Sequence, residues 1–551
     1  MLAGLDKESL DLAVDAFRDF AREKLPDETL LDLDEKDEFP EDLVREMCGE
    51  LGIQLLFIEE EFGGMGGGAF DVYRICEALA AVDLGVATGV LATFLGSDPI
   101  RFGGTLEQQQ RWLGRIAEEG LLMAYCATEP EAGSDLGALR SQAERVEKDG
   151  EIVGYSINGS KQWISNGGFA DLYSVLAIAP QGPTWFIVER GTEGLSFGQP
   201  EDKHGIRASN TAAVNFADVY VDRDSLVGGE EGQGLIQAQN VFGYTRLMVA
   251  AFGLGGGWAA LDRAIPYSTE RIQGGSPLSE KEGYTHKLIV PHVVRLEAAR
   301  AFIEETAERI DSGEGTLNTE GAIAKYLASE AGLGAADAAI QALGGYGYTR
   351  EYMVEKIRRD VRITTIYEGT SEILEMTMAR DRWQMHLKTR GQYYHEQARE
   401  LEALHLVKST VGADIAALAS HALAEILERA RLARLTRHQH ILLRFGELVA
   451  WVEGAAGLAR RAARAAEDRL SEKTDRRFKP PALAVMARVF AREAALKVAS
   501  EGVKLVVGGG GLQEGGLSEL ETAAKLPQIR ERMRGLLQDQ DEIVKIVYAD
   551  V

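Results

Sequence analysis

The sequence has few cysteines, no clustered histidines and no long apolar run. Its three cysteines, Cys48, Cys76 and Cys126, lie far apart and form no CxxC, so neither a disulfide framework nor a zinc–cysteine site is expected, which fits a reducing compartment. The nine histidines are scattered without the spacing of metal ligands, so we expect no metal site. No stretch of about 18 uninterrupted apolar residues occurs, so no segment is expected to span a membrane.

Basic residues are also scarce. The chain carries 60 Lys and Arg against 86 Asp and Glu, a net charge of −26. Nucleic-acid binding needs a basic surface, so this balance argues against it. The first 25 residues lack the basic and apolar regions of a signal peptide and are too acidic for a transit peptide. A cytoplasmic location is therefore expected.

The periodicity of apolar residues changes along the chain of 551 residues, which is too long for one core. Residues 1–122 have helical spacing, and residues 123–234 contain short segments rich in β-branched and aromatic residues. Helical spacing returns in residues 235–384. Residues 385–551, rich in Ala, Leu, Arg and Glu, indicate an added helical bundle. The sequence therefore predicts an α+β fold with a β-barrel or sheet domain between helical domains.

Two glycine-rich segments are candidates for phosphate-binding loops. A phosphate-binding loop requires a strand–helix pattern, and residues 61–70 do not have it. We therefore interpret them as a flexible connection. The glycines at 508–511 lack the following Lys-Ser/Thr pair. Neither segment favours a nucleotide-binding loop.

Four separated segments carry residues suited to chemistry. Taken singly, they have ordinary explanations: a turn, a packed tryptophan, a helix C-cap and a solvated glutamate. Their joint occurrence in this order is more informative. The segments are YCATEPEAGSD at 125–135, KQWISNGG at 161–168, QALGGYGY at 341–348 followed by Arg350 and Glu351, and IYEGTS at 366–371.

Together these four segments resemble the acyl-CoA dehydrogenase family over about residues 1–384. The resemblance implies an N-terminal helical domain, a middle β-domain and a C-terminal four-helix domain, with FAD bound between them. It also implies oxidation of an acyl-CoA thioester to its 2,3-enoyl form, as in fatty acid β-oxidation. The longer members of the family carry an extra C-terminal helical domain, which is the expected nature of residues 385–551.

Isoalloxazine is a flat, largely apolar ring with a polar edge, so its site needs an aromatic wall and short hydroxyl or backbone donors. Two of the segments supply these residue types, and we expect them to lie on neighbouring strands. The resemblance puts Ser165 near flavin N5, packs Trp163 by the ring, and places Ser134 at the phosphate and pantetheine end, where it also meets substrate. The expected FAD contacts in this part of the chain are Tyr125, Ala127, Thr128, Ser134, Trp163 and Ser165.

The negatively charged diphosphate favours an arginine. Arg271 matches the family arginine that reaches this group across a subunit interface. Two departures follow it: Gly274-Gly275 stands where Phe-Gly is usual, and Glu282 where a glutamine often contacts FAD. The remaining residues expected at FAD from the resemblance are Gln341, Gly345 and Thr370.

Glu368 is the expected catalytic base. The α-proton of a thioester is weakly acidic, so the base must be partly desolvated, and donors must polarise the carbonyl. Tyr367 can exclude water, and Gly369 lets backbone approach the thioester. Some members carry the base on another helix, where this chain has Thr245, which cannot serve. Arg246 is a candidate for electrostatic support near substrate, with a surface helix arginine as the alternative.

The resemblance also bears on substrate and assembly. Residues 87–93 match the helix along the acyl cavity and carry no charge, which favours a neutral acyl chain of undetermined length and branching. The extension favours a homodimer over a tetramer, because in longer members it replaces a second dimer. Its locally basic, amphipathic stretches leave peripheral membrane contact open, although burial in the bundle is favoured.

Three functional hypotheses remain. The leading one is a dehydrogenase that passes electrons to an electron-transferring flavoprotein. The second is an acyl-CoA oxidase or enoyl-CoA reductase on the same scaffold. The third is a non-catalytic assembly or scaffold homologue, which retention of Glu368 and the flavin residues disfavours.

Overall fold

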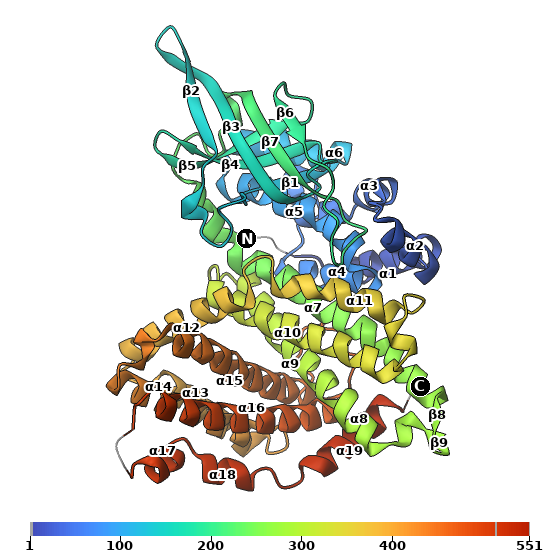
Figure 1. Cartoon of the computed structure of the whole chain (residues 1–551), viewed down its shortest axis with the longest axis vertical. Coiled ribbons are helices and arrows are strands. Elements are labelled where there is room, and N and C mark those ends of the chain that lie inside the picture. The colour runs from blue at the N-terminus through green and yellow to red at the C-terminus, as the bar shows by residue number, and fades with distance from the viewer. Residues whose placement is uncertain (1–3, 513–514, 550–551) are drawn as a thin grey trace. The chain divides into compact units, whose positions relative to one another are not determined.

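The computed structural model describes residues 4–512 and 515–549 (Figure 1). The described chain forms two compact units, each with its own core. The chain passes from one unit to the other inside the helices α7 (Gly234–Glu270) and α9 (Val290–Asp311), and again after Thr316, so neither unit is one continuous segment. The first unit comprises Met1–Met248 and Ala307–Thr316, and the second comprises Val249–Thr306 and Leu317–Val551.

The first unit begins with amphipathic helices whose ends follow local capping rules. Asp6 precedes the first helix and accepts a hydrogen bond from the Ser9 N–H at 2.7 Å. Thr105 and Gln108 form a reciprocal capping box at the start of α6. The helices are α1 (Lys7–Lys24), α2 (Asp27–Lys36), α3 (Glu41–Gly49), α4 (Ala69–Val82), α5 (Leu84–Gly103), α6 (Leu106–Glu119) and the start of α7 (Gly234–Glu270).

A seven-stranded sheet follows, in the order β1-β4-β2-β3-β7-β6 with β5 paired to β4. The long strands β2, β3 and β7 pair antiparallel (Figure 1). The sheet is not purely antiparallel, because β1 and β4 pair in parallel. The strands are β1 (Met123–Cys126), β2 (Gln142–Lys148), β3 (Glu151–Ser165), β4 (Leu172–Ala179), β5 (Gly182–Glu189), β6 (Leu195–Phe197) and β7 (Thr211–Asp222).

The glycine-rich segment at 61–70 is packed, so its interpretation as a flexible connection is wrong. The N–H groups of Met65 and Gly67 donate to the carbonyls of Leu55 and Leu56. A Cβ atom on Gly67 would lie 2.5 Å from the Leu56 oxygen, so only glycine fits there. Asp311, at the end of α9 (Val290–Asp311), accepts hydrogen bonds from the Ala69 and Phe70 N–H groups. Residues 307–316 thereby cap the first turn of α4.

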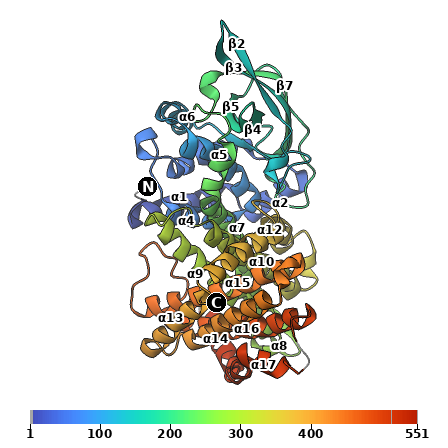
Figure 2. The same cartoon turned by 90° about the vertical axis from the view of Figure 1, so that its left-hand side faces the viewer.

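The second unit is helical apart from a short hairpin, β8 (Ile272–Gln273) and β9 (Ser276–Pro277). In the extension, the long helices α15 and α16 lie side by side and pack with α14 (Figure 2). The helices of this unit, besides the rest of α7 and most of α9, are α8 (Glu282–Leu288), α10 (Asn318–Leu343), α11 (Met353–Val361), α12 (Ser371–Lys388), α13 (Tyr393–Val407), α14 (Ala413–Leu432), α15 (Gln439–Ala466), α16 (Pro480–Gly508), α17 (Leu517–Ala523), α18 (Leu526–Glu531) and α19 (Leu536–Val547).

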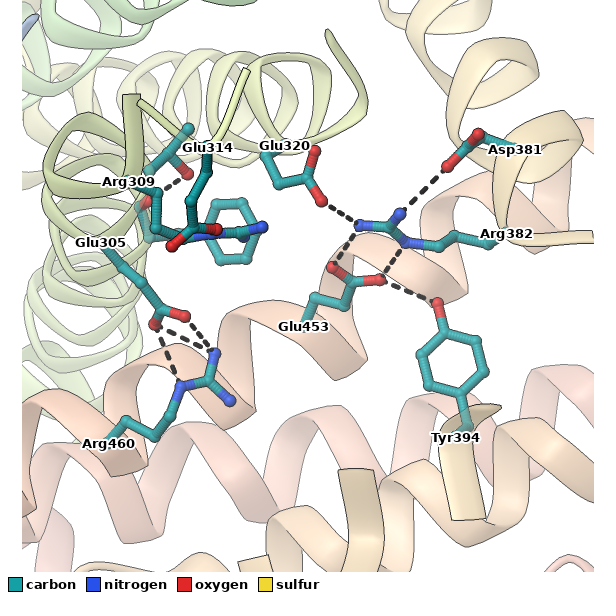
Figure 3. A network of polar contacts seen from close by, with 11 residues as sticks. Glu305, Arg309, Glu314, Glu320, Asp381, Arg382, Tyr394, Glu453 and Arg460 are labelled. Carbon is teal, nitrogen blue, oxygen red and sulfur yellow. Dashed lines mark hydrogen bonds and ion pairs between the residues drawn. The ribbon is translucent and has the colours of Figure 1, made fainter. Parts of the chain in front are cut away.

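A buried ion network joins the extension to the preceding helices. Arg382 on α12 donates through Nε and Nη2 to both carboxylate oxygens of Glu453 on α15, at 2.6 and 3.0 Å (Figure 3). Its Nη2 also bonds Glu320 on α10 at 2.9 Å. The Tyr394 hydroxyl donates to Glu453 at 2.9 Å. A half-exposed pair, Arg460 with Glu305, links α15 to α9 nearby. The extension therefore shares its core with the helices before it.

The predicted fold class is confirmed: helical segments flank a sheet, and further helices form a bundle at the C-terminal end. Within the described part of the chain, no helix combines the length and apolar character needed to cross a membrane. The three cysteines are buried and unbridged.

Candidate active site

In the first unit, a buried ion pair joins the two signature segments. Lys161, on β3, has no exposed surface, and its Nζ lies 2.7 Å from Glu129 Oε1. The same Nζ donates to the carbonyls of Ala127 and Leu176. Burial alone would raise the pKa of Glu129. Hydrogen bonds, of which the one from Lys161 has the largest effect, hold this pKa below its ordinary value. The pair fixes the turn after β1 against β3.

A bulge in β3 turns Trp163 outward. Lys161 pairs with Val214 and Ile164 with Ala212, so Gln162 and Trp163 together oppose a single β7 residue. Trp163 consequently has a positive φ of 61° and is 61% exposed. A tryptophan in this strained and solvent-facing position is not core packing, which removes the ordinary explanation of this residue.

The bulge also brings the two signature segments together. The Gln162 N–H donates to the Thr128 carbonyl at 3.0 Å. Ser165 follows Trp163 by two residues and pairs with Thr211 on β7. The expectation that the segments lie on neighbouring strands is wrong, because β1 pairs with β4 and not with β3 in the sheet. The loop after β1, rather than β1 itself, reaches β3.

The other expected residues of this unit differ in exposure. Tyr125 is half-buried and packs on Trp185 with ring centroids 4.8 Å apart. Ala127 is buried, and Ser134 is exposed in the loop after the tight Glu129–Ala132 turn. Ser134 is therefore free of the core and accessible to a ligand.

On α7, Thr245 and Arg246 are both buried, with exposures of 1% and 7%. The alternative that Arg246 is a surface helix arginine is therefore wrong. Thr245 Oγ1 has no hydrogen-bond partner among the described residues. A buried threonine cannot act as a carboxylate base, so α7 offers no base at this position.

In the second unit, Arg271 follows α7 at the base of the short hairpin. Gly274 and Gly275, with φ of 58° and 87°, form its two-residue turn, a geometry that glycine adopts without strain. The Leu278 N–H donates to the Arg271 carbonyl at 2.9 Å. The exposed Arg271 guanidinium lies 5.9 Å from the centre of the Tyr346 ring. The structure thus brings Arg271 to the glycine-rich turn after α10.

That turn is also exposed. Gly344, with a φ of 63°, ends α10, and its N–H donates to the Ile340 and Gln341 carbonyls, so the helix C-cap explanation holds for this glycine. Gln341 and Gly345 are both exposed beside it. Both are therefore accessible in the turn whose Tyr346 ring lies near the Arg271 guanidinium, and guanidinium, amide and backbone donors suit a diphosphate.

Glu368 lies in the turn between residues 362–365, which form a 3-10 helix, and α12. Its φ is 53°, and the next residue, Gly369, has a φ of 94°. The Gly369 carbonyl accepts a hydrogen bond at 2.7 Å from Nζ of Lys325, a fully buried lysine on α10. Two successive left-handed residues are strained for a non-glycine side chain, so the turn is held by its surroundings. Glu368 and Tyr367 are half-buried.

Thr370 ends this turn and begins α12. Its hydroxyl accepts from the Ile373 N–H at 3.3 Å, so this side chain caps the helix. The next residue, Ser371, donates to Glu330 at 2.6 Å. The chain directly after Glu368 is therefore held by Lys325 and Glu330 of α10 and by the Thr370 cap of α12.

Sequence reasoning missed two lysines. Lys325 stands in the otherwise apolar stretch GAIAKYLA, and an isolated charge there is the signal that could have identified it. Lys161 has the polar neighbours Ser160 and Gln162, so its surroundings in the sequence carry no such signal. Of the predicted residues, the structure brings Thr128 and Ser165 to the Trp163 bulge in the first unit. In the second unit it brings Tyr346, the residue after Gly345, near Arg271.

These residues fit FAD. The exposed Trp163 ring follows Gln162, whose N–H is bonded to Thr128, and precedes Ser165 on β3, so an aromatic ring and two hydroxyl-bearing residues occur close together in the chain's fold, as an aromatic ring with a polar edge requires. Arg271 offers the cation that a diphosphate needs. Among the described residues, none of those proposed here to contact FAD belongs to a group of candidate metal ligands.

Comparisons with known proteins agree with a FAD-binding site. Family models match three parts of the chain: the acyl-CoA dehydrogenase N-terminal domain at 7–120, the middle domain at 124–219 and the C-terminal domain at 232–382. An acyl-CoA dehydrogenase of Bacillus subtilis (strain 168) is 36% identical over 372 residues, 66% of this chain and 95% of the relative.

Two solved structures are informative. A chain in the structure of the electron transferring flavoprotein of Acidaminococcus fermentans is 34% identical, with a TM-score of 0.63, covering 68% of this chain and 97% of its own. The acyl-CoA dehydrogenase from Bacillus anthracis complexed with FAD is 24% identical, with a TM-score of 0.81, covering 98% of this chain and 95% of its own. The second likeness extends through the C-terminal bundle and shows a shared fold.

The matched domains, the coverage of the relatives and the flavin-suited residues agree, and the chain belongs to the acyl-CoA dehydrogenase family of FAD-dependent oxidoreductases.

Proposed function

We propose that this protein oxidises an acyl-CoA thioester to the 2,3-enoyl-CoA, with Glu368 as the base that removes the α-proton. The observation that carries this proposal is the turn before α12. Glu368 is held in a left-handed conformation, and the following carbonyl is bonded by the buried Lys325. A strained backbone fixed in this way is typical of a residue whose side chain must be aimed.

The proposed chemistry explains why the base is held. The α-proton of a thioester is weakly acidic, so its removal requires a carboxylate in a defined position with limited access to water. Glu368 is half-buried, with the half-buried Tyr367 before it. The family resemblance assigns the main-chain N–H of Glu368 to the thioester carbonyl, where it would stabilise negative charge during proton removal. Tyr367, Gly369 and Arg246 are proposed to contact the substrate.

When bound, FAD supplies the acceptor for the β-hydride. The residues proposed to hold its ring are Trp163, through its exposed face, and Thr128 and Ser165, through their hydroxyls. Tyr125 and Ala127 support this region, and Ser134 lies in the accessible loop proposed for the phosphate and pantetheine end.

Arg271, Gln341 and Gly345 are proposed to bind the diphosphate and adenosine end of a FAD molecule held mainly by a second copy of the chain, with Thr370 nearby. The exposure of all three in one region supports this proposal. We propose a homodimer. The buried Arg382 network supports it, because it makes the extension integral to this unit, and in the longer members that the chain resembles the extension takes the place of a second dimer.

The acyl group is proposed to be neutral. Along α5 the hydroxyls of Thr88 and Thr93 are engaged by backbone groups, at Leu84 and Met123 respectively. The charged pair further along the helix, Arg101 with Asp98, is buried and self-compensating. This leaves the helix segment 87–93 without a charge for a second carboxylate.

We also propose that electrons pass to an electron-transferring flavoprotein, since a chain in a structure of such a protein is similar to this one. The test is a flavin spectrum recorded anaerobically with saturated acyl-CoA thioesters of varied length and branching. Bleaching that persists until an electron-transferring flavoprotein is added supports the dehydrogenase. Rapid recolouring in air with peroxide formation would identify an oxidase, and bleaching by NADH alone would identify a reductase.

The role of the base is tested with Glu368→Gln. Flavin content should be unchanged, while turnover should fall by about 10³-fold, the scale of general base catalysis. Glu372→Gln is the matched control, because Glu372 lies exposed in the next turn of the chain. Turnover of Glu368→Gln close to that of the control would mean that another group takes the proton.

A further inference from the structure

Outside the proposed active site, one grouping of metal-binding side chains joins the extension to the family domain. Glu282 and His286 lie one turn apart on α8, so both face the same side of the helix. Asp541 comes from α19, near the C-terminal end, which packs on α8. Among the described residues, this is the group whose three candidate ligand atoms all lie within 4.8 Å of one another.

Thr285 contacts one ring nitrogen of its neighbour His286. The buried Thr285 hydroxyl is within 3.3 Å of the Lys281 carbonyl and 3.4 Å of the Glu282 carbonyl, to which it donates. Its oxygen lies 3.2 Å from His286 Nδ1, and in the tautomer that carries its proton on Nδ1 this oxygen accepts that hydrogen bond. In the neutral ring this leaves a lone pair on Nε2. Orientation of one ring nitrogen by a hydrogen bond is the usual support of a metal-binding histidine.

The free nitrogen faces a carboxylate without hydrogen bonding to it. His286 Nε2 lies 3.2 Å from Asp541 Oδ1, yet this solvent-shielded nitrogen has no hydrogen-bond partner among the described residues. A lone pair directed near a carboxylate is repulsive unless a cation lies between them. Two ligands of one tetrahedral zinc ion lie about 3.3 Å apart, with their lone pairs converging on the metal. The observed separation matches this arrangement.

We propose that Glu282, His286 and Asp541 form a zinc site that ties α19 to α8. One imidazole and two carboxylates are ligands that Zn²⁺ accepts, and their two negative charges balance the ion. Three protein ligands leave a fourth position for water. Glu282 and Asp541 are exposed, so the ion can enter from solvent. Glu282 is also the residue that departs from the glutamine common in the family, and a carboxylate is the stronger ligand.

The test uses the FAD-loaded full chain after treatment with a chelator, titrated with ZnCl₂ in competition with a chromogenic chelator. One zinc ion per chain is expected, and His286→Ala and Asp541→Asn should each weaken binding by at least about tenfold. His440→Ala is the control, because it removes an exposed histidine elsewhere. Co²⁺ in place of Zn²⁺ should give the visible absorption of a tetrahedral site, absent in the two ligand variants.

Binding of equal strength in the wild type and both ligand variants would overturn the proposal, as would the absence of binding. If circular dichroism shows that a ligand variant is misfolded, Glu282→Gln decides, because this exposed residue can be changed without disturbing the core. The site would likewise be rejected if Glu282→Gln and Asp541→Asn both fold and both bind zinc as tightly as the wild type.

Discussion

Lys161 Nζ and Glu129 Oε1 lie 2.7 Å apart, and almost none of either side chain is exposed. Removing one partner would leave an uncompensated charge in the core. We therefore expect Lys161→Met to lower the free energy of unfolding by about 3–5 kcal/mol, measured by urea denaturation. The double variant Lys161→Met with Glu129→Leu should lose less than Lys161→Met alone. A larger loss in the double variant would contradict this account.

Trp163 should matter for flavin binding and little for stability. Because its ring is 61% exposed, Trp163→Ala should leave the melting temperature nearly unchanged. Loss of the aromatic contact should weaken FAD binding by roughly tenfold, about 1.4 kcal/mol. Titration of the apoprotein with FAD measures this. Tyr220→Ala, an exposed aromatic on β7, serves as control and should bind FAD normally.

Glu375 should make stability depend on pH. Burial raises the pKa of its carboxyl to about 7, while the Tyr326 hydroxyl bonded to it opposes this rise and the nearby Glu447 adds to it. The folded protein therefore binds more protons than the unfolded chain between about pH 4.5 and about pH 7, so stability should fall as pH rises through this window.

The size of this effect is moderate because Glu375 is only partly buried. We expect a loss on the order of 1–2 kcal/mol, allowing for solvent screening. Urea denaturation at about pH 5 and about pH 8 should show this loss in the wild type and much less of it in Glu375→Gln. Glu400→Gln, an exposed residue on α13, should behave like the wild type.

The ion pairs of Figure 3 should differ in strength. Arg382 is buried and bonded to Glu453 and Glu320, so Arg382→Met should lower the free energy of unfolding by about 3–5 kcal/mol. Arg460 pairs with Glu305 near the surface, and Arg460→Met should cost only about 0.2–1 kcal/mol. Similar losses of unfolding free energy in both variants would show that burial does not determine how much each ion pair contributes to stability.

Local patterns predicted much of this molecule. The change from helical to strand periodicity located the sheet, and the family resemblance carried by the segments around Glu368 and Trp163 identified the candidate site. What these patterns could not give were partners distant in sequence. The bond from Lys325 to Gly369 spans 44 residues, and the fit of Gly67 against the Leu56 carbonyl depends on packing. Neither contact can be predicted from the periodicity of apolar residues.

The Trp163 bulge shows the same limit in another form. Residue types predicted an aromatic wall, but the outward direction of this ring comes from two residues opposing one across β7. Strand order was likewise unpredicted, because chain order does not reveal that β1 pairs in parallel with β4. Expecting neighbouring strands was wrong for this reason.

The cap that Asp311 provides for α4 constrains the order of events during synthesis. Asp311 leaves the ribosome about sixty residues after Met248, the last residue of the long first segment of its unit. The nascent unit therefore completes its structure only when a segment of the later α9 helix has been made. Until then the first turn of α4 lacks its carboxylate, and the growing chain should be most open to proteases at this point.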